Sequence, residues 1–147
     1  MPDTAPTDPM SDGLTDEAVA AILRGVRSIA LVGWSPRPDR PSHGVARFLA
    51  ARGYRVIPVN PGQAGQQALG ETVVATLAEA GPVDMVDIFR RSEEAGAVVD
   101  EAIAAGAKVV WMQLGIADQA AAARARAAGL QAVMNRCPAI EIPRLGL

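Results

Sequence analysis

The residues best suited to chemistry in this sequence are five arginines: Arg37, Arg40, Arg90, Arg91 and Arg136. Thirteen of the 14 basic residues of the chain are arginine, so composition alone does not single these five out. Each of them, however, lies shortly after an apolar run of the sequence. A guanidinium group presents a planar set of donors that matches phosphate and carboxylate. The five positions therefore indicate binding of a small, multiply charged anion.

The single histidine, His43, and the single cysteine, Cys137, could in principle act as base and nucleophile. No third group that would orient them is evident, and a cysteine beside a proline is typical of a small buried hydrophobe. One histidine and one cysteine are also too few for a tetrahedral metal site. We expect neither catalysis nor metal binding; the alternative is a nucleotide-binding enzyme or a redox protein that uses Cys137.

The elements that must position these residues are strands and helices in alternation. Five continuous apolar runs predict strands buried on both faces, at residues 28–33, 54–59, 83–89, 108–112 and 130–134. Helices are predicted between them at 43–52, 93–105 and 119–128, capped by Ser42, Ser92 and Asp118. A further helix is predicted from the N-cap Thr15 onward. The alternation predicts an α/β fold: a Rossmann-like, doubly wound parallel sheet in three layers, with a short edge strand at 72–74.

Ligands of such sheets bind at the carboxyl ends of the strands, where the strand order reverses. The five arginines follow predicted strands, so they gather at this end together with the helix start at Ser42–Gly44. Arginines kept on loops only for solubility are the alternative. The dinucleotide fingerprint is absent, because the next glycine after Gly33 is Gly44. Asn60 stands where an acid would hold a nicotinamide ribose, and no P-loop is present, so hydride chemistry is disfavoured.

Length and charge exclude several classes of protein. The 147 residues suffice for one domain, which we place at residues 14–147 after a disordered leader at 1–13. A net charge of -2 argues against a nucleic-acid binder, and no apolar stretch approaches the ~20 residues that span a membrane. The N-terminus lacks the features of a signal peptide, and one cysteine cannot form an internal disulfide. We expect a cytoplasmic protein, monomeric or a small homo-oligomer.

Five ordered segments resemble a known family. They are VGWSPRPDRPSHGV (32–45), GYRVIPVNP (53–61), VDIFRR (86–91), WMQLGI (111–116) and RCP (136–138). These segments resemble the small stand-alone CoA-binding proteins, whose fold is similar to the N-terminal CoA-binding domain of the succinyl-CoA synthetase alpha subunit. The resemblance covers about residues 15–145. It implies a Rossmann-like domain that holds coenzyme A, free or acylated, across the carboxyl end of the sheet.

The resemblance also implies roles for particular residues. Gly33, Ser35 and the helix start formed by Ser42, His43 and Gly44 would line the phosphate loop, and Asn60 and Pro61 would flank the adenosine. Phe89, Arg90 and Gln113 would lie along the pantetheine arm, with Arg91 and Gly115 beside them. Our electrostatic assignment adds Arg37 and Arg40 as phosphate ligands, because coenzyme A carries a 3′-phosphate and a pyrophosphate. Trp34 replaces a small residue of the family pattern, so it either stacks on adenine or packs in the core.

The phosphorylated histidine of succinyl-CoA synthetase lies in a domain that this chain lacks, so the resemblance implies binding without catalysis. The protein would carry, sequester or sense coenzyme A or an acyl-CoA. A regulatory adaptor that responds to the ligand is a further alternative.

Overall fold

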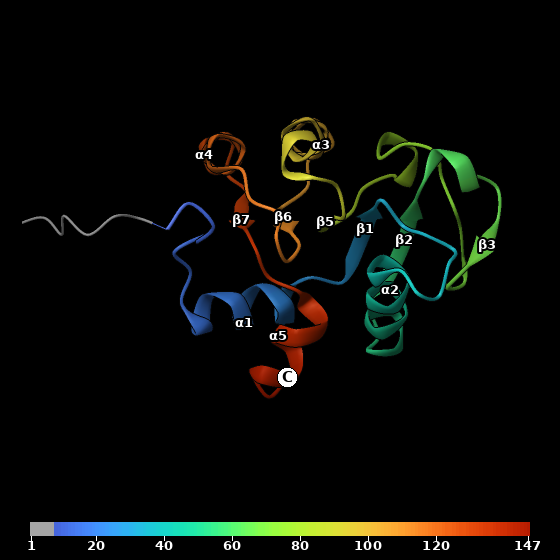
Figure 1. Cartoon of the computed structure of the whole chain (residues 1–147), viewed down its shortest axis with the longest axis horizontal. Helices are drawn as coiled ribbons and strands as arrows, with labels where there is room; N and C mark the ends of the chain where they lie inside the picture. The colour runs from blue at the N-terminus through green and yellow to red at the C-terminus, as the bar shows by residue number, and fades with distance from the viewer. Residues whose placement is uncertain (1–7) are drawn as a thin grey trace, which may run out of the picture.

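A five-stranded parallel sheet forms the middle layer of the protein (Figure 1). The computed structural model describes residues 8–147. The strand order is β2-β1-β5-β6-β7, and every neighbouring pair is parallel. The strands are β1 (Ser28–Val32), β2 (Arg55–Val59), β5 (Met85–Ile88), β6 (Val109–Met112) and β7 (Gln131–Val133). All five predicted strands are thus confirmed, each shortened by one or more residues: β5 and β7 at both ends, the other three at one end.

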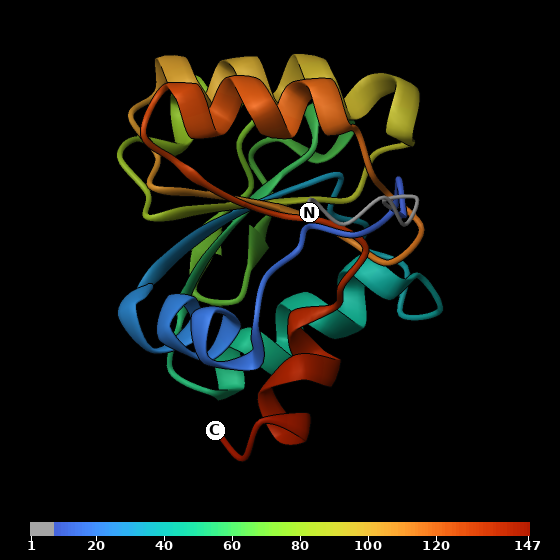
Figure 2. The same cartoon turned by 90° about the vertical axis from the view of Figure 1, so that its left-hand side faces the viewer.

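Helices cover both faces of the sheet and make the other two layers (Figure 2). One face carries α3 (Ser92–Ala104) and α4 (Gln119–Ala127), which pack side by side. The other carries α1 (Asp16–Gly25), α2 (Pro41–Ala51) and a helix the sequence analysis does not predict, α5 (Pro138–Arg144). Because both faces are covered, the strands are mostly apolar, apart from Asp87 in β5 and the first residues of β1, β2 and β7, and their buried apolar residues divide between two core clusters. The doubly wound three-layer fold is confirmed.

Two of the four predicted helix caps are present. Thr15 Oγ1 accepts from Ala18 N (3.2 Å), and Asp118 Oδ1 accepts from Ala121 N (3.0 Å). The predicted caps of α2 and α3 were wrong: these N-cap positions belong to Arg40 and Arg91, without a side-chain hydrogen bond. Helix α2 therefore starts at Pro41, two residues earlier than predicted, because the fixed φ of proline suits the first helical position.

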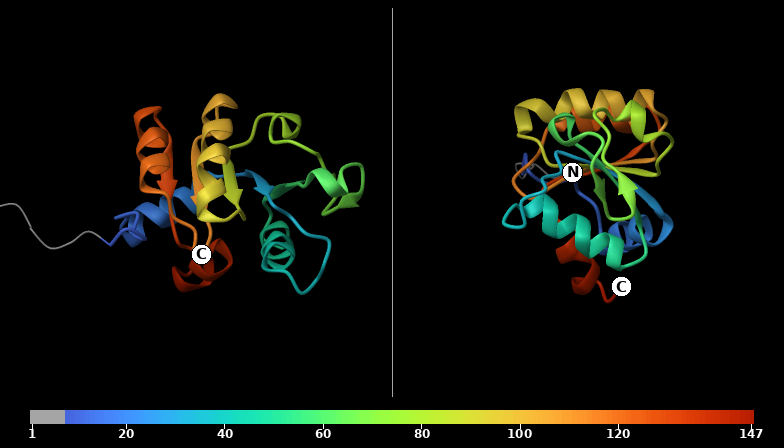
Figure 3. Two further views of the ribbon diagram at one scale, coloured as in Figure 1. Left: turned by 45° about the horizontal axis from the view of Figure 1, so that its top comes forward. Right: turned by 90° about the vertical axis from the view of Figure 1, so that its right-hand side faces the viewer.

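The region between β2 and β5 is built from short elements at the edge of the sheet. It contains the 3₁₀ turns η1 (Pro61–Gln63) and η2 (Ala78–Ala80) and an antiparallel hairpin of β3 (Gln67–Ala68) and β4 (Glu71–Thr72). Figure 3 shows this hairpin beyond β2, at the rim of the molecule. The predicted edge strand at 72–74 does not form as one element: Thr72 belongs to β4 of the hairpin, and Val74 forms a single parallel bridge with Val59. The position of β2 at the edge of the main strand order fits Pro58, which has no N–H to donate.

The residues before α1 differ from the expected leader. Residues 1–7 lie outside the described part of the chain, but Asp12 is buried and accepts from Met134 N at 3.0 Å. The side chain of Gln119 also donates to the backbone carbonyls of Pro9 and Ser11. The chain is therefore attached to the domain before residue 13, through polar contacts that composition does not indicate.

Candidate functional site

A cleft opens where the strand order reverses, at the carboxyl ends of β1 and β5. After β1 the chain turns outward to β2, and it then returns to the other side of β1 as β5, so the loops that follow β1 and β5 diverge. The cleft between them has a volume of about 390 Å³. Nine of the predicted site residues line it: Gly33, Trp34, Ser35, Arg37, Arg40, Ser42, Asn60, Phe89 and Arg90. Pro41 also lines the cleft and was not among the predicted residues.

Gly33 allows the first loop to leave β1 at this point. Its φ of +94° lies in a region that side chains rarely adopt, and a Cβ there would come within 2.3 Å of the carbonyl oxygen of Phe89. The N–H groups of Gly33 and Trp34 both point to the carbonyl of Val59 on the neighbouring strand. Position 33 therefore requires glycine for two reasons: its φ is positive, and the backbone of Phe89 leaves no room for a Cβ.

The rest of the β1–α2 loop is held by side chains that the sequence analysis assigned to ligand contact. Asn60 Nδ2 donates to the carbonyl of Trp34 (2.6 Å), and Asn60 Oδ1 accepts from Gly62 N (2.8 Å). His43 Nδ1 lies 3.0 Å from the carbonyl of Ser35, so this nitrogen carries the proton. The rings of Trp34 and His43 stack with centroids 6.1 Å apart. Trp34 is 5% exposed and belongs to the core cluster, which favours its packing role.

The cleft is positively charged. Arg37, Arg40 and Arg90 line it, and no aspartate or glutamate does. Arg37 pairs with Asp39 outside the lining, at 3.2 Å and with both side chains mostly exposed, so it is held weakly. Within residues 8–147, Arg40 and Arg90 form no ion pair. The N-terminal turn of α2 adds the positive end of its dipole and the N–H of Ser42, whereas Pro41 has no N–H and the N–H groups of His43 and Gly44 donate to the carbonyl of Arg40. This arrangement can bind an anion such as a phosphate ester.

The remaining predicted residues lie beside the cleft or away from it. Arg91 and Gly115 line an adjoining hollow of about 380 Å³ that shares Arg90 with the cleft. His43 and Gly44 follow in the first turn of α2, and Pro61 is exposed at the start of η1. Gln113, directly after β6, is buried.

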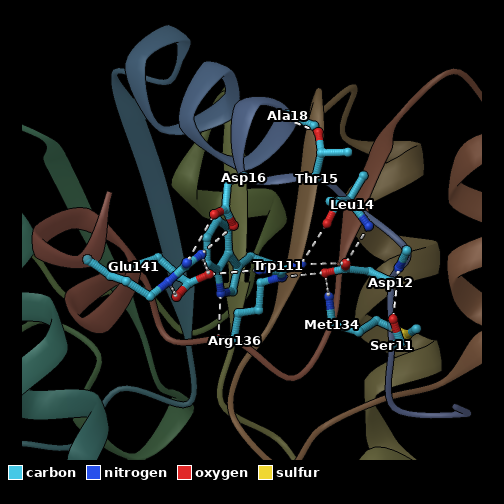
Figure 4. A network of polar contacts seen from close by, with 12 residues as sticks. Ser11, Asp12, Leu14, Thr15, Asp16, Ala18, Trp111, Met134, Arg136 and Glu141 are labelled. Carbon is cyan, nitrogen blue, oxygen red and sulfur yellow. Dashed lines mark hydrogen bonds and ion pairs between the residues drawn. The ribbon is translucent and has the colours of Figure 1, made fainter. Parts of the chain in front are cut away.

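Arg136 does not belong to the anion cluster, although the sequence analysis placed it there. Its guanidinium donates to Asp12 at 2.9 and 3.0 Å, to Glu141 at 2.8 Å and to the carbonyl of Leu14 at 3.1 Å (Figure 4). Its carbonyl accepts from Trp111 Nε1. These hydrogen bonds of the Arg136 guanidinium link the segment that precedes α1 with helix α5. The missed partners, Asp12 and Glu141, carry no sequence signal, because nothing in their local pattern points to an arginine after β7.

The carboxyl groups of this network are ionised in the folded protein. Burial by itself would raise the pKa of Asp12, but hydrogen bonds from Arg136 and from the backbone outweigh it and lower that pKa. A hydrogen bond from Arg144 lowers the pKa of Glu141, burial opposes it, and Arg136 adds to the lowering. Two arginines thus compensate the buried acids at the carboxyl end of β7.

Two buried polar side chains of the sheet region, on β5 and directly after β6, lack partners. The carboxyl oxygens of Asp87, in the middle of the sheet on β5, and Oε1 of Gln113 have no hydrogen-bond partner within the described chain. Asp87 is fully buried, and desolvation raises its pKa well above the ordinary value of 3.8. The alternation along β5 places it on the same face as Met85, toward α1, α2 and α5. Asp87 is therefore an acid in an apolar layer, and its burial favours the neutral form.

The burial of Asp87 predicts that the wild-type protein and the Asp87→Asn variant differ in stability by an amount that depends on pH. The folded state holds a proton that the unfolded state releases near pH 3.8, so wild-type stability falls as pH rises toward the folded pKa. The asparagine variant lacks this loss and gains relative stability by up to about 1.4 kcal/mol per pH unit over that window. Urea denaturation of both proteins from pH 4 upward measures the difference. A constant difference would show that Asp87 is ionised throughout.

Residues 27–143 match the model of the family described as CoA binding domain. The chain belongs to this CoA-binding domain family. A Bacillus subtilis (strain 168) relative, the uncharacterized protein YneT, is 39% identical over 120 residues, which are 81% of this chain and 87% of the relative. A hypothetical protein from Pyrococcus horikoshii OT3 has a similar structure, with a TM-score of 0.85 and 38% identity over 98% of this chain and all of that one.

The fold of the family also occurs in a larger enzyme. An acetyl-coenzyme A synthetase from Ca. Korarchaeum cryptofilum matches 76% of this chain with a TM-score of 0.62 and 21% identity. The match covers 26% of the synthetase chain, so this protein corresponds in fold to one part of that enzyme. The predicted resemblance to stand-alone CoA-binding proteins and to the synthetase domain is confirmed at the level of family and fold.

The described residues hold no second candidate for catalysis or metal binding. Cys137, 7% exposed, precedes α5 and packs in the core. Between residues 8 and 147 no group of three histidine, cysteine or acidic side chains is placed to hold a metal ion. Over the same residues, no helix has the length and apolar character needed to cross a bilayer.

Proposed function

We propose that this protein binds coenzyme A without transforming it, with the phosphates of the ligand in the cleft between the β1 and β5 loops. The observation that carries the proposal is the cleft itself: three arginines and the start of α2 surround it, and no acid lines it. Membership of the CoA-binding domain family supports the choice of coenzyme A among phosphate-bearing ligands.

The charge distribution suits the phosphate groups of this ligand. Coenzyme A carries a pyrophosphate and a separate 3′-phosphate, and Arg37 and Arg40 extend from the same loop while Arg90 approaches from the neighbouring one. Charge-assisted hydrogen bonds from guanidinium to phosphate are about twice as strong as neutral ones. We assign Arg37 and Arg40 to one phosphate group and Arg90 to the other side of the cleft, where the pantetheine arm would leave.

Binding without catalysis is the other half of the proposal. Its support is the separation of the two residues that could do chemistry: His43 belongs to the first turn of α2, whereas Cys137, 7% exposed, lies after β7 and lines a cavity that does not include His43. With acetyl-CoA as substrate, we expect thioester cleavage no faster than in buffer. The measurement is the amount of free thiol that is released over time. Cleavage that is lost in Cys137→Ser would instead establish thiol catalysis.

Calorimetric titration tests the ligand. We expect saturable binding of coenzyme A, weaker binding of dephospho-coenzyme A, and little binding of NADH, which has a pyrophosphate but lacks the 3′-phosphate. Tight binding of NADH without binding of coenzyme A would contradict the proposal. Mass spectrometry of whatever small molecule is released on denaturing the purified protein gives an independent answer.

Removing a cleft arginine should weaken binding of coenzyme A. We expect Arg90→Ala and Arg37→Ala each to raise the Kd about three- to tenfold at low salt, because each loses a charge-assisted contact of about 1 kcal/mol. The dependence of Kd on salt should become flatter, since screening acts on the charges that were removed. Arg126→Ala is the matched control, an exposed arginine of α4 on the far face of the sheet. Unchanged affinity in both cleft variants would mean that the arginines are only solvated surface.

A further inference from the structure

A second cavity lies at the same end of the sheet, beyond β6 and β7. Its volume is about 410 Å³, and its walls come from the segment before α1, the loops after β6 and β7, and α5. Leu114 and Ile140 contribute to it; they are 54% and 51% exposed and are the large hydrophobic side chains most open to solvent in the described chain. Cys137 forms part of the wall.

The two cavities lie along the same carboxyl edge of the sheet. The strands run in the order β1, β5, β6, β7, so the phosphate cleft and the second cavity are two to three strand spacings apart, roughly 10–14 Å. Between them lies the hollow that shares Arg90 with the cleft and contains Gly115, the chain neighbour of Leu114. An extended pantetheine arm is long enough to follow this edge from the cleft to the second cavity.

The second cavity has the opposite charge to the cleft. Four acids line it (Asp8, Asp12, Asp16 and Glu141) against two arginines, a net formal charge of −2. Both arginines are already engaged: Arg136 pairs with Asp12 and Glu141, and Arg144 pairs with Asp16 and Glu141, each at 2.8–2.9 Å. No arginine of this cavity is therefore left to receive an additional carboxylate.

We propose that this cavity receives the thiol end of the ligand together with a short neutral acyl group, and that it disfavours acyl groups that end in a carboxylate. Leu114 and Ile140 provide apolar contact for the acyl chain, and the surrounding acids repel a further negative charge. This inference rests on the proposed binding of coenzyme A and adds the class of acyl group that the protein prefers.

Titration with two matched thioesters tests the inference. Butyryl-CoA and succinyl-CoA have acyl groups of four carbons and differ in the terminal carboxylate. We expect butyryl-CoA to bind at least as tightly as free coenzyme A, and succinyl-CoA to bind about tenfold more weakly than butyryl-CoA at low salt. Equal affinities for the two thioesters would overturn the inference. Absence of binding by free coenzyme A would instead overturn the proposed function.

Two variants locate the selectivity in this cavity. Asp16→Asn removes one exposed charge and one partner of Arg144, so it should reduce the preference for butyryl-CoA roughly threefold. Asp100→Asn is the matched control, because Asp100 forms a similar exposed pair with Arg124 between α3 and α4. Leu114→Asp should weaken the binding of butyryl-CoA and leave the affinity for free coenzyme A unchanged. Selectivity that is unchanged in Asp16→Asn, or binding of butyryl-CoA that is unchanged in Leu114→Asp, would place the acyl group elsewhere and refute the inference.

Discussion

Replacement of Gly33 by alanine is expected to lower the free energy of unfolding by about 2–4 kcal/mol and to raise the Kd for coenzyme A more than tenfold. Two costs add: left-handed strain of about 1 kcal/mol and overpacking of about 1–3 kcal/mol, because the new Cβ would lie 2.3 Å from the carbonyl oxygen of Phe89. That oxygen belongs to backbone, so it can move away only by displacing the β5 loop, which carries Arg90 into the cleft.

Gly53 provides a matched control for this substitution. Its φ of +98° is close to the +94° of Gly33, but a Cβ there would meet nothing within 4 Å. Gly53→Ala should therefore cost only the conformational strain, about 1 kcal/mol, and leave ligand binding unchanged. Urea denaturation and calorimetric titration of both variants compare the two. Equal losses of stability would show that the contact with Phe89 is not the source of the larger cost.

Substitution of Arg136 by alanine is expected to lower the free energy of unfolding by about 3–5 kcal/mol at pH 7. The side chains of Asp12 and Glu141 are 1% and 8% exposed, so removing the guanidinium leaves two carboxylates buried near each other with less compensation. Arg124→Ala is the control, because its ion pair with Asp100 is about half exposed and should contribute less than about 1 kcal/mol. Similar effects of the two substitutions in urea denaturation would contradict the assigned role of the network.

The network of Arg136, Asp12 and Glu141 also predicts how the stability of the protein changes at acidic pH. The pKa values of Asp12 and Glu141 are lowered on folding, so their contribution is present above the ordinary values of 3.8 and 4.5 and is lost as pH falls through the folded values. The difference in stability between the wild-type protein and Arg136→Ala should therefore shrink as pH falls below about 4.5. A difference that persists unchanged in acid would mean that packing of the arginine stem, rather than its charge, is responsible.

The order and type of the main elements could be predicted because the signals are local. Continuous apolar runs mark strands buried on both faces, and the caps Thr15 and Asp118 lie next to the helices they begin. Helix starts were less predictable where two signals compete: at α2 a proline and a serine stand side by side, and the fixed φ of Pro41 prevails. The short helix α5 was missed because it has few residues and a proline within it.

The phosphate cleft was largely predictable because topology converts position along the chain into position in space. In a parallel sheet every strand ends at the same edge, so residues after β1 and β5 meet there however far apart they are in sequence. Nine of the predicted residues line the cleft for this reason. The specific role of Asn60 was not predictable, since its bond to the Trp34 carbonyl depends on how two loops pack.

The amino-acid sequence by itself determined a doubly wound α/β domain of a CoA-binding family, with arginines following its strands. Only the tertiary structure decided which of these arginines are free to meet an anion. Arg136 follows a strand as Arg90 does, yet it is neutralised by Asp12, 124 residues away. Such a pairing depends on side chains brought together by folding, and the strength of each charge depends on burial, which no local pattern records. One end of the sheet thus carries two adjacent cavities of opposite charge.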